Sequence, residues 1–214
     1  MLFPDNKIAI ICNAPIENIS KLKEKVASFP VLIAVDGGIN HCYKLGLHPD
    51  LIVGDFDSAD PTLLKNFENV PKKSYPQDKD KTDLEIALEL VYHAQVKEIT
   101  VFGALGGRTD HTLGNLILLS RYPGKVFFET DNERIFVIDH QAEISSYPGQ
   151  LISLIPLNGP VKGIDTEELK WKLKNATLDK QFIGISNEAL GQRVLISVKK
   201  GDLLCCVNNT KRRK

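Results

Sequence analysis

KIAIICNAPIENISKLKEKVASFPVLIAV, residues 7–35, contains two short apolar runs separated by a segment with helical periodicity. The runs, Ile8–Cys12 and Val31–Val35, show no polar alternation, which is typical of strands buried on both faces of a parallel sheet. Between them, apolar residues recur every three or four positions from Ile16 to Phe29, and Pro30 marks the end of that helix. The stretch therefore predicts a strand, a helix and a second strand, the arrangement of an α/β domain with a parallel sheet.

The alternation of strands and helices continues further along the chain. Strand-like runs follow at Leu51–Val53 and Ile99–Phe102. Two more helices have start signals: Thr82 opens a capping box, in which its side chain accepts a hydrogen bond from the amide three residues later, and Thr109 opens the second helix. One face of that second helix is expected to be buried, and it carries Leu113, Leu116, Ile117 and Ser120.

Helical periodicity disappears after about residue 135, and short strand-like runs separated by proline and glycine turns remain. These runs are Leu151–Ile155, Leu169–Leu173, Arg193–Val198 and Leu203–Val207. The segment Lys199–Asp202 is expected to form a hairpin turn between the last two runs. The sequence therefore predicts an α/β domain with a mostly parallel sheet over residues 1–135, followed by an all-β sandwich domain over residues 136–214.

The composition is that of a soluble globular protein. The 214 residues are 43% hydrophobic and 25% charged, and 27 basic residues balance 27 acidic ones. A net charge of zero gives no long-range attraction to nucleic acid or to an anionic membrane, so neither is expected as a partner. No apolar stretch approaches the roughly 18 residues of a membrane span, and the four cysteines lack the paired spacing of a zinc site. We therefore expect a cytoplasmic protein with reduced cysteines.

Acidic residues gather where predicted strands end. Asp36 directly follows the second strand of the opening stretch, Asp55 and Asp57 follow the third predicted strand, and the segment 78–83 adds three more carboxylates. A single aspartate in such a place is more simply explained as a helix cap, and the charged segment as a solvated loop. Ligands of open α/β sheets bind at the carboxyl ends of the strands, and unpaired carboxylates would repel one another. The whole set therefore favours a divalent cation with bound phosphates.

A glycine-rich turn leads into the last predicted helix. Gly106 and Gly107 let backbone amides approach phosphate oxygens, and Arg108 offers a planar fork for a phosphate. The spacing matches neither the Rossmann fingerprint nor the P-loop. His111 and Asn115 lie one helical turn apart, facing away from the apolar stripe, and beside Arg108 we interpret them as nucleotide contacts.

Four motifs of the first domain occur in a specific order. They are Asp36-Gly37-Gly38, Gly54-Asp55-Phe56-Asp57-Ser58, Lys79-Asp80-Lys81-Thr82-Asp83, and Gly106-Gly107-Arg108-Thr109-Asp110-His111 with Asn115. In order and separation they resemble the thiamine pyrophosphokinase family, and residues 169–173 and 184–188 continue the match in the second domain. The resemblance implies a homodimer in which the α/β domain binds ATP with Mg²⁺ and the sandwich helps to bind thiamine. The active site would lie between the two subunits.

The resemblance also implies a reaction, in which the diphosphoryl group of ATP is transferred to the hydroxyl of thiamine, giving thiamine diphosphate and AMP. The catalytic carboxylates would be Asp55, Asp57, Asp80, Asp83 and Asp110, with Mg²⁺ held by Asp55, Asp57 and Asp83. Either Asp80 or Asp110 would accept the hydroxyl proton. The nucleotide would be bound by Asp36, Gly37, Thr82, Gly106, Gly107, Arg108, His111 and Asn115, and thiamine by Thr166, Trp171, Ser186 and Asn187.

The chain departs from the family pattern in the thiamine loop, and two other functions stay open. Asp165 stands where the family has Thr or Ser, and Glu168 where it has glycine. The run 51–57 also resembles the nucleophile turn of haloacid-dehalogenase phosphatases, with Asp55 as the nucleophile. A module that senses Mg-ATP without turnover would use the same glycine-rich turn.

Overall fold

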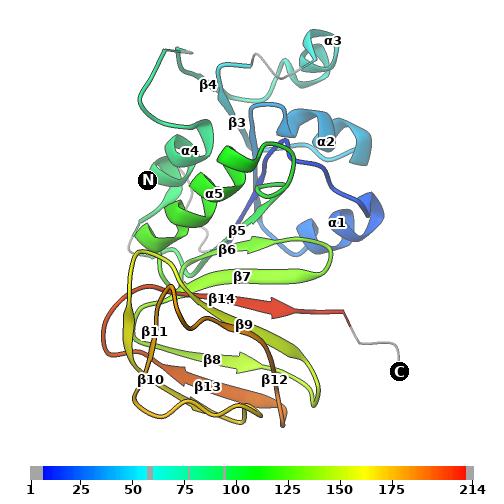
Figure 1. The fold of residues 1–214 in the computed structure, drawn as a ribbon. Helices are drawn as coiled ribbons and strands as arrows, with labels where there is room; N and C mark the ends of the chain where they lie inside the picture. Colours follow the sequence, from blue (N-terminus) through cyan, green and yellow to red (C-terminus); the bar gives the residue numbers. More distant parts are fainter. Residues whose placement is uncertain (1–6, 57–59, 77, 94, 211–214) are drawn as a thin grey trace. The chain divides into compact units, whose positions relative to one another are not determined.

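The computed structural model describes residues 7–56, 60–76, 78–93 and 95–210 (Figure 1). The chain divides into two compact units. Unit 1 comprises residues 1–115 with 128–131, and unit 2 comprises residues 116–127 with 132–214.

Unit 1 is built on a parallel sheet. Its strands are β1 (Lys7–Ile11), β2 (Val31–Val35), β3 (Leu51–Gly54), β4 (Lys72–Ser74) and β5 (Glu98–Phe102), and β6 (Val126–Glu129) contributes residues to both units. The five strands lie in the order β5-β1-β2-β3-β4, and each neighbouring pair is parallel. The chain thus moves outward from β1 to β4 and returns to place β5 on the other side of β1. The predicted α/β domain is confirmed, and its topological switch point lies between β1 and β5.

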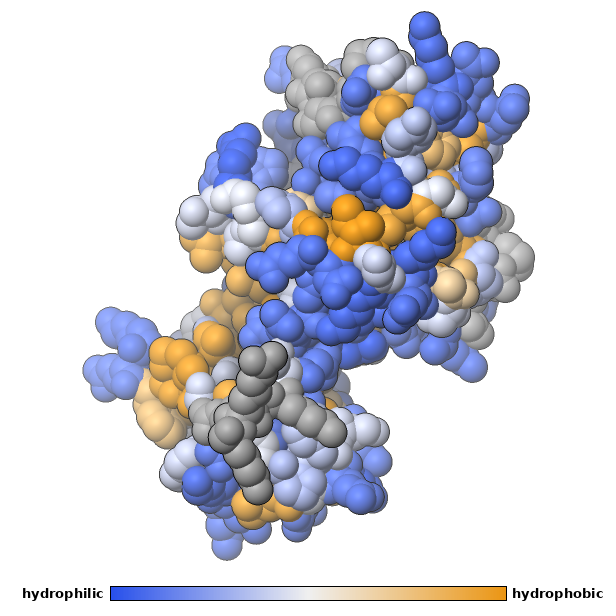
Figure 2. All heavy atoms as spheres, turned by 90° about the vertical axis from the view of Figure 1, so that its right-hand side faces the viewer, coloured by the Kyte–Doolittle hydropathy of each residue, from blue (hydrophilic) through white to orange (hydrophobic). Residues whose placement is uncertain are grey.

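Helices cover both faces of this sheet (Figure 1). They are α1 (Ile19–Val26), α2 (Gly38–Leu45), α3 (Pro61–Leu64), α4 (Asp83–Val91) and α5 (Thr109–Leu118), with the 3-10 turns η1 (Lys65–Phe67) and η2 (Leu119–Arg121). α1 and α2 share a buried core with one face of the sheet, whereas α4 packs on the other face. Figure 2 views the side on which α1 and α2 lie, and this side is mostly hydrophilic, as expected for the outer faces of amphipathic helices.

Local signals explain where most of these helices begin. Thr82 Oγ1 accepts a hydrogen bond from the Glu85 amide at 3.2 Å, as the capping box predicts. Asp60 caps α3 by accepting from the Thr62 amide at 2.8 Å. α2 lacks such a signal: its first flanking residue is Gly37, and no side chain caps it. The sequence therefore does not predict this short helix.

The predicted burial of one face of α5 is wrong. Leu113 and Ile117 are 56% and 53% exposed, and the buried residue of this helix is Leu118. The helical period identifies an apolar face, but it does not show whether another part of the same chain covers that face. α5 therefore presents large apolar side chains at the surface.

Unit 2 is an antiparallel β-sandwich, as predicted. Its strands are β7 (Glu133–Ile138), β8 (Gln141–Ser145), β9 (Leu151–Pro156), β10 (Val161–Glu167), β11 (Ala176–Leu178), β12 (Gly184–Glu188), β13 (Arg193–Ser197) and β14 (Leu203–Asn208). One layer has the order β12-β9-β14-β7, and the other has the order β11-β10-β13-β8. Inward side chains of both layers, such as Leu154 and Cys205 from one and Ile164 and Ile196 from the other, form a common core.

Two predictions within unit 2 are wrong. Residues 169–173 form a loop rather than a strand, because Glu168 adopts the left-handed conformation (φ 58°) and turns the chain out of the extended direction. Lys199–Asp202 is not a hairpin turn, since it leads from β13 in one layer to β14 in the other, where β14 pairs with β7 and β9. Turn residues mark a change of direction, but they do not show which strand comes next to which.

No helix in the described ranges combines the length and the apolar character that a membrane crossing requires. The cysteines Cys12, Cys42, Cys205 and Cys206 are all free thiols.

Candidate active site

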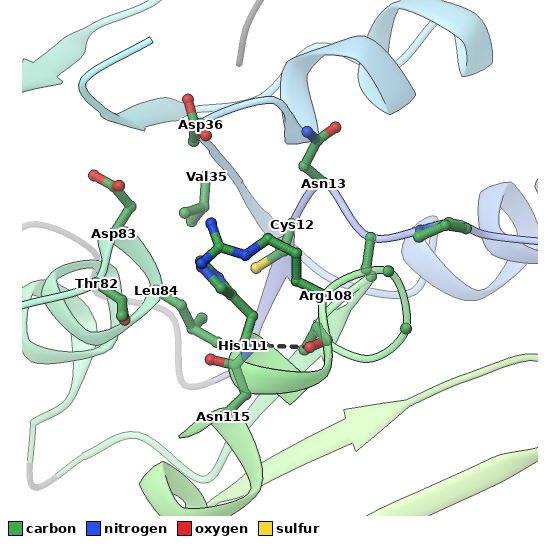
Figure 3. A pocket seen from close by; sticks show the side chains of 16 residues that line it. Cys12, Asn13, Val35, Asp36, Thr82, Asp83, Leu84, Arg108, His111 and Asn115 are labelled. Atoms are coloured by element: carbon green, nitrogen blue, oxygen red, sulfur yellow. Dashed lines mark hydrogen bonds between the residues drawn. The ribbon is translucent and has the colours of Figure 1, made fainter. Parts of the chain in front are cut away.

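A cavity of unit 1 lies at the switch point of the sheet (Figure 3). It has a volume of about 370 Å³ and is lined by the loops after β1 and β5, the end of β2, and the first residues of α4 and α5. The strands of a parallel sheet all end at the same edge, and the loops diverge where the strand order reverses, so a crevice forms there. Its size suits a small organic ligand.

The loop after β1 contributes four lining residues that no sequence pattern marks: Cys12, Asn13, Ala14 and Pro15. Gly37, which the sequence places in the nucleotide site, lies beneath this loop. A Cβ atom at Gly37 would meet the Asn13 side chain at 2.4 Å, so the missing side chain makes room for the loop. Burial, together with the charges of Asp36 and Asp83, raises the pKa of the Cys12 thiol to about 12, so this thiol is not a nucleophile at neutral pH.

Asp36 follows β2 in a strained conformation with φ 49°. Its backbone amide donates to the Val53 carbonyl at 2.8 Å, which fixes the residue at the edge of the sheet. Within the described part of the chain, its Oδ1 atom is buried and has no hydrogen-bond partner. A buried carboxylate oxygen without a donor is costly, so it indicates a position where a ligand or cation supplies the missing contact.

Asp55 and Asp83 are joined by one lysine. The Lys79 ammonium lies 3.4 Å from Asp55 Oδ2 and 3.2 Å from Asp83 Oδ1, and less than a fifth of each of the three side chains is exposed. Burial raises the pKa of Asp83, Lys79 lowers it, and the charges of Asp55 and Asp36 raise it again. Asp36, Asp55 and Asp83, here called the acidic cluster, therefore concentrate negative charge at one side of the cavity.

The acidic cluster fits a hard divalent cation. Across the described ranges no three metal-binding side chains are close enough together to form a ready-made metal site. The unpartnered oxygen of Asp36 and the mutual repulsion felt by Asp83 are nevertheless what a bound cation would relieve. Asp57, the third ligand expected from the sequence, lies outside the described residues.

Asp80 lies away from this cavity. Its side chain is exposed and lines a separate hollow of about 450 Å³, together with Tyr75, Lys81 and Glu89. The structure therefore brings Asp36 and Asp83 to the cavity at the switch point, with Asp55 linked to Asp83 through Lys79, but it does not bring Asp80 there.

The glycine-rich turn lies at the side of the cavity opposite the acidic cluster, where Figure 3 shows Arg108 and His111. Gly106 (φ 97°) and Gly107 (φ 70°) adopt conformations that other residues rarely reach. Arg108 Nε and its terminal nitrogen donate to the two carboxylate oxygens of Asp110 at 3.1 and 2.6 Å. This fork holds the guanidinium at the start of α5.

Asp110 is poorly suited to accept a proton. It is mostly exposed, and Arg108, followed by the His111 amide, lowers its pKa to about 2. Asn115 has a mainly structural contact, because its Nδ2 donates to the Ala104 carbonyl at 2.8 Å and ties α5 to the glycine-rich turn. Thr82 and His111, which the sequence assigns to the nucleotide, line the cavity.

Trp171 in unit 2 is 54% exposed, so it is not a core residue. Asn187, which is buried, fixes its backbone: Asn187 Oδ1 accepts from the Trp171 amide at 3.0 Å, and Asn187 Nδ2 donates to the Trp171 carbonyl at 2.8 Å. The Lys170 ammonium lies 4.8 Å from the centre of the indole ring. The loop thus presents an aromatic side chain at the surface on a fixed backbone.

The other residues assigned to thiamine divide between buried and exposed positions. Thr166 is buried, and its Oγ1 accepts from the Leu173 amide at 2.9 Å. Ser186 is exposed in a left-handed conformation (φ 60°). Asp165, one of the departures from the family pattern, accepts from the Asn175 amide at 2.9 Å. Thr166 and Asp165 therefore hold the ends of the Trp171 loop, whereas Ser186 is accessible.

Comparison with known proteins identifies the family. Family profiles match residues 22–129 ("Thiamin pyrophosphokinase, catalytic domain") and 137–203 ("vitamin B1 binding domain"). The chain is 30% identical to thiamine pyrophosphokinase of Bacillus subtilis (strain 168), over 92% of this chain and 96% of that protein. It is 34% identical to thiamine pyrophosphokinase 2 of Arabidopsis thaliana, over 82% and 77% of the two chains.

Solved structures agree with these relatives. The crystal structure of thiamine pyrophosphokinase from Bacillus subtilis has a TM-score of 0.82 at 25% identity, covering 96% of this chain and 100% of that one. The structure of thiamin pyrophosphokinase from Geobacillus thermodenitrificans has a TM-score of 0.83 at 25% identity, covering 96% and 98%. The chain therefore belongs to the thiamine pyrophosphokinase family and is an enzyme, a thiamine diphosphokinase.

Proposed function

We propose that ATP is the diphosphoryl donor and that AMP is the second product. The thiamine oxygen forms a bond to the β-phosphorus of ATP, the bond from that phosphorus to the oxygen bridging to the α-phosphorus breaks, and AMP leaves with this oxygen. One observation carries the proposal: a cavity at the switch point has Asp36 and Asp83 of the acidic cluster on one side and the glycine-rich turn with Arg108 on the other.

The nucleotide phosphates would bind at the glycine-rich turn. The first amides of α5 point out of the helix without intrahelical partners, and the helix dipole favours an anion there. Arg108 adds a positive charge, which its fork to Asp110 already orients. These groups hold the phosphates in position. Diphosphoryl transfer mainly needs such positioning and little covalent chemistry from the protein.

Mg²⁺ would be held by Asp55 and Asp83, with Asp57 as a further ligand. Asp36, whose charge acts on Asp83 and whose Oδ1 has no partner among the described residues, would contribute a further oxygen. When bound, the ion would neutralise charge on the phosphate oxygens as the bond to the leaving group breaks. The acidic cluster gathers several carboxylates in one partly buried place. One divalent cation there would bind more favourably than separate monovalent ions.

The hydroxyl proton of thiamine does not need a strong base. A pKa of about 2 makes Asp110 a weak acceptor, and Asp80 lines the other hollow. Phosphoryl transfer commonly passes through a loose transition state, in which the attacking hydroxyl keeps its proton until late. Positioning of the hydroxyl and the phosphates is therefore expected to matter more here than proton abstraction.

Thiamine would stack on Trp171. A cationic ring stacked on an indole face contributes about 0.5–2 kcal/mol to binding. The hydrogen bonds from Asn187 keep the backbone of Trp171 fixed. Ser186 is exposed on β12, the strand that also carries Asn187, and is available to a polar group of the vitamin.

The enzyme would act as a homodimer in the cytoplasm. Large apolar side chains are exposed on and around β12, namely Phe182, Ile183, Ile185 and Leu190, and on α5. Exposed apolar side chains in such number favour association with a second copy, and the free thiols suit a reducing compartment. Completion of the active site by the partner subunit is part of this proposal.

The test is chromatographic detection of AMP after incubation with Mg-ATP, with and without thiamine. AMP and thiamine diphosphate appearing in equal amounts, and only with thiamine, is the expected result. Release of inorganic phosphate with a phospho-aspartate at Asp55 would instead favour a phosphatase. Binding of ATP without any product would favour a sensing module.

A further inference from the structure

Lys79 is placed differently from an ordinary surface lysine. Only 14% of its side chain is exposed, and its ammonium lies between Asp55 and Asp83, at 3.4 and 3.2 Å. The neighbouring Lys81 is 48% exposed and pairs with Glu89 at 2.7 Å on the outside of α4. Two lysines that are two residues apart therefore have different surroundings, and only Lys79 faces the acidic cluster.

Lys79 lies where negative charge is concentrated in unit 1. Asp83 experiences the charges of both Asp55 and Asp36, and it is partly buried, so water screens these charges weakly. Without a cation, the acidic cluster would repel itself and the start of α4 would be displaced from β3. The ammonium of Lys79 supplies one positive charge and links the loop after β3 to α4.

We propose that Lys79 is a built-in counter-ion that keeps the acidic cluster assembled when no divalent cation is bound, and that gives up this place to the cation. The inference rests on the magnesium site proposed above. Both charges cannot occupy the space between Asp55 and Asp83, because an ammonium and a divalent ion repel each other at contact distance. Lys79 therefore competes with Mg²⁺, and its released ammonium is free to turn toward the anionic phosphates that arrive with the ion.

Binding of Mg²⁺ without nucleotide tests the competition. In Lys79→Met the competing charge is absent, so we expect the dissociation constant for Mg²⁺, measured by isothermal titration calorimetry, to fall by about tenfold or more. In EDTA the melting temperature of this variant should be lower than that of the wild type, and Mg²⁺ should restore it. Lys81→Met is the matched control, and it should bind Mg²⁺ as the wild type does.

Labelling of the wild-type protein gives a second measurement that does not depend on a folded variant. An amine-reactive reagent followed by mass spectrometry should modify Lys79 slowly in EDTA and faster with saturating Mg²⁺, while the modification of Lys81 stays constant. Equal Mg²⁺ affinity in wild type and Lys79→Met, or unchanged labelling of Lys79 when Mg²⁺ raises the melting temperature, would overturn the role of Lys79 and leave the magnesium site intact. Absence of Mg²⁺ binding in every variant would overturn both.

Discussion

Replacing Asn187 with alanine should loosen the Trp171 loop and weaken thiamine binding. Asn187 is 7% exposed and makes three hydrogen bonds: to the Trp171 amide and carbonyl at 3.0 and 2.8 Å, and to the Glu188 amide at 2.9 Å. A hydrogen bond of this kind contributes about 1 kcal/mol, so the variant should lose about 2–3 kcal/mol of unfolding free energy. Water can reach the freed groups beside the half-exposed Trp171, which keeps the loss at the lower end.

The matched control is Gln150→Ala. Gln150 is also buried (4% exposed) and makes three side-chain hydrogen bonds, to Tyr147, Asn208 and Asn209. None of them involves Trp171, so this variant should lose similar stability without changing the loop. Urea unfolding followed by circular dichroism measures both losses.

Trp171 itself reports on the loop, because it is the single tryptophan of the chain. In Asn187→Ala, acrylamide should quench its fluorescence more strongly and the KM for thiamine should rise about fivefold or more, with kcat nearly unchanged. In Gln150→Ala both should stay at wild-type values. The reasoning is refuted if the two variants share the same KM, or if quenching does not increase when Asn187 is removed.

Three further changes test other parts of the molecule. Glu168→Gly should raise the unfolding free energy by about 1 kcal/mol in urea denaturation, since Glu168 has φ 58° and glycine adopts this conformation without strain. Burial raises the pKa of Asp83 above its unfolded value, so its ionised form destabilises the fold at neutral pH, and this cost disappears as the pH falls. Asp83→Asn should accordingly keep or raise the melting temperature at pH 7, and below about pH 4 its melting temperature should equal that of the wild type. Its turnover should fall by at least about 100-fold. A large loss of stability at pH 7 would instead make Asp83 a structural residue. If the protein is the proposed homodimer, Ile185→Glu should give a folded monomer in light scattering, because Ile185 is 56% exposed within one chain; a variant that stays dimeric would exclude β12 from the interface.

The sequence predicts those parts of the fold that depend on local patterns. Unalternated apolar runs predict β1 and β2 because both faces of these strands are covered, and Thr82 predicts the start of α4 because its side chain replaces a missing backbone partner. What covers an apolar face is not local. The exposed Leu113 and Ile117 of α5 show this, because their spacing is the same as it would be in a buried helix.

The sequence predicts charged residues of the site but not the uncharged loop after β1. Asp36 and Asp55 are recognisable because carboxylates rarely end buried strands without a reason. The loop Cys12–Pro15 carries no charge, and its place in the cavity depends on β5 lying beside β1, which only the strand order reveals. Asp80 and Asp83 are three residues apart, but the start of α4 turns Asp83 toward the cavity and leaves Asp80 at the surface.

Backbone strain in the described residues is confined to the two regions proposed to bind substrates. The non-glycine residues with positive φ are Asp36, Phe56, Glu168, Asn175 and Ser186. Asp36 and Phe56 lie just after β2 and β3, Glu168 and Asn175 lie on either side of the Trp171 loop, and Ser186 lies within β12. Each such conformation costs about 1–3 kcal/mol and persists only where the surroundings fix it. A chain selected for stability alone would have glycine at these five positions. A higher free energy of unfolding in Glu168→Gly would show this for one of them. Phe56 packs against the core shared by α1 and α2, so its conformation is explained by packing. Asp36 belongs to the acidic cluster, and Glu168 and Asn175 bound the loop that presents Trp171, so the strain at these three residues is better explained by the need to hold a carboxylate and an indole in fixed directions.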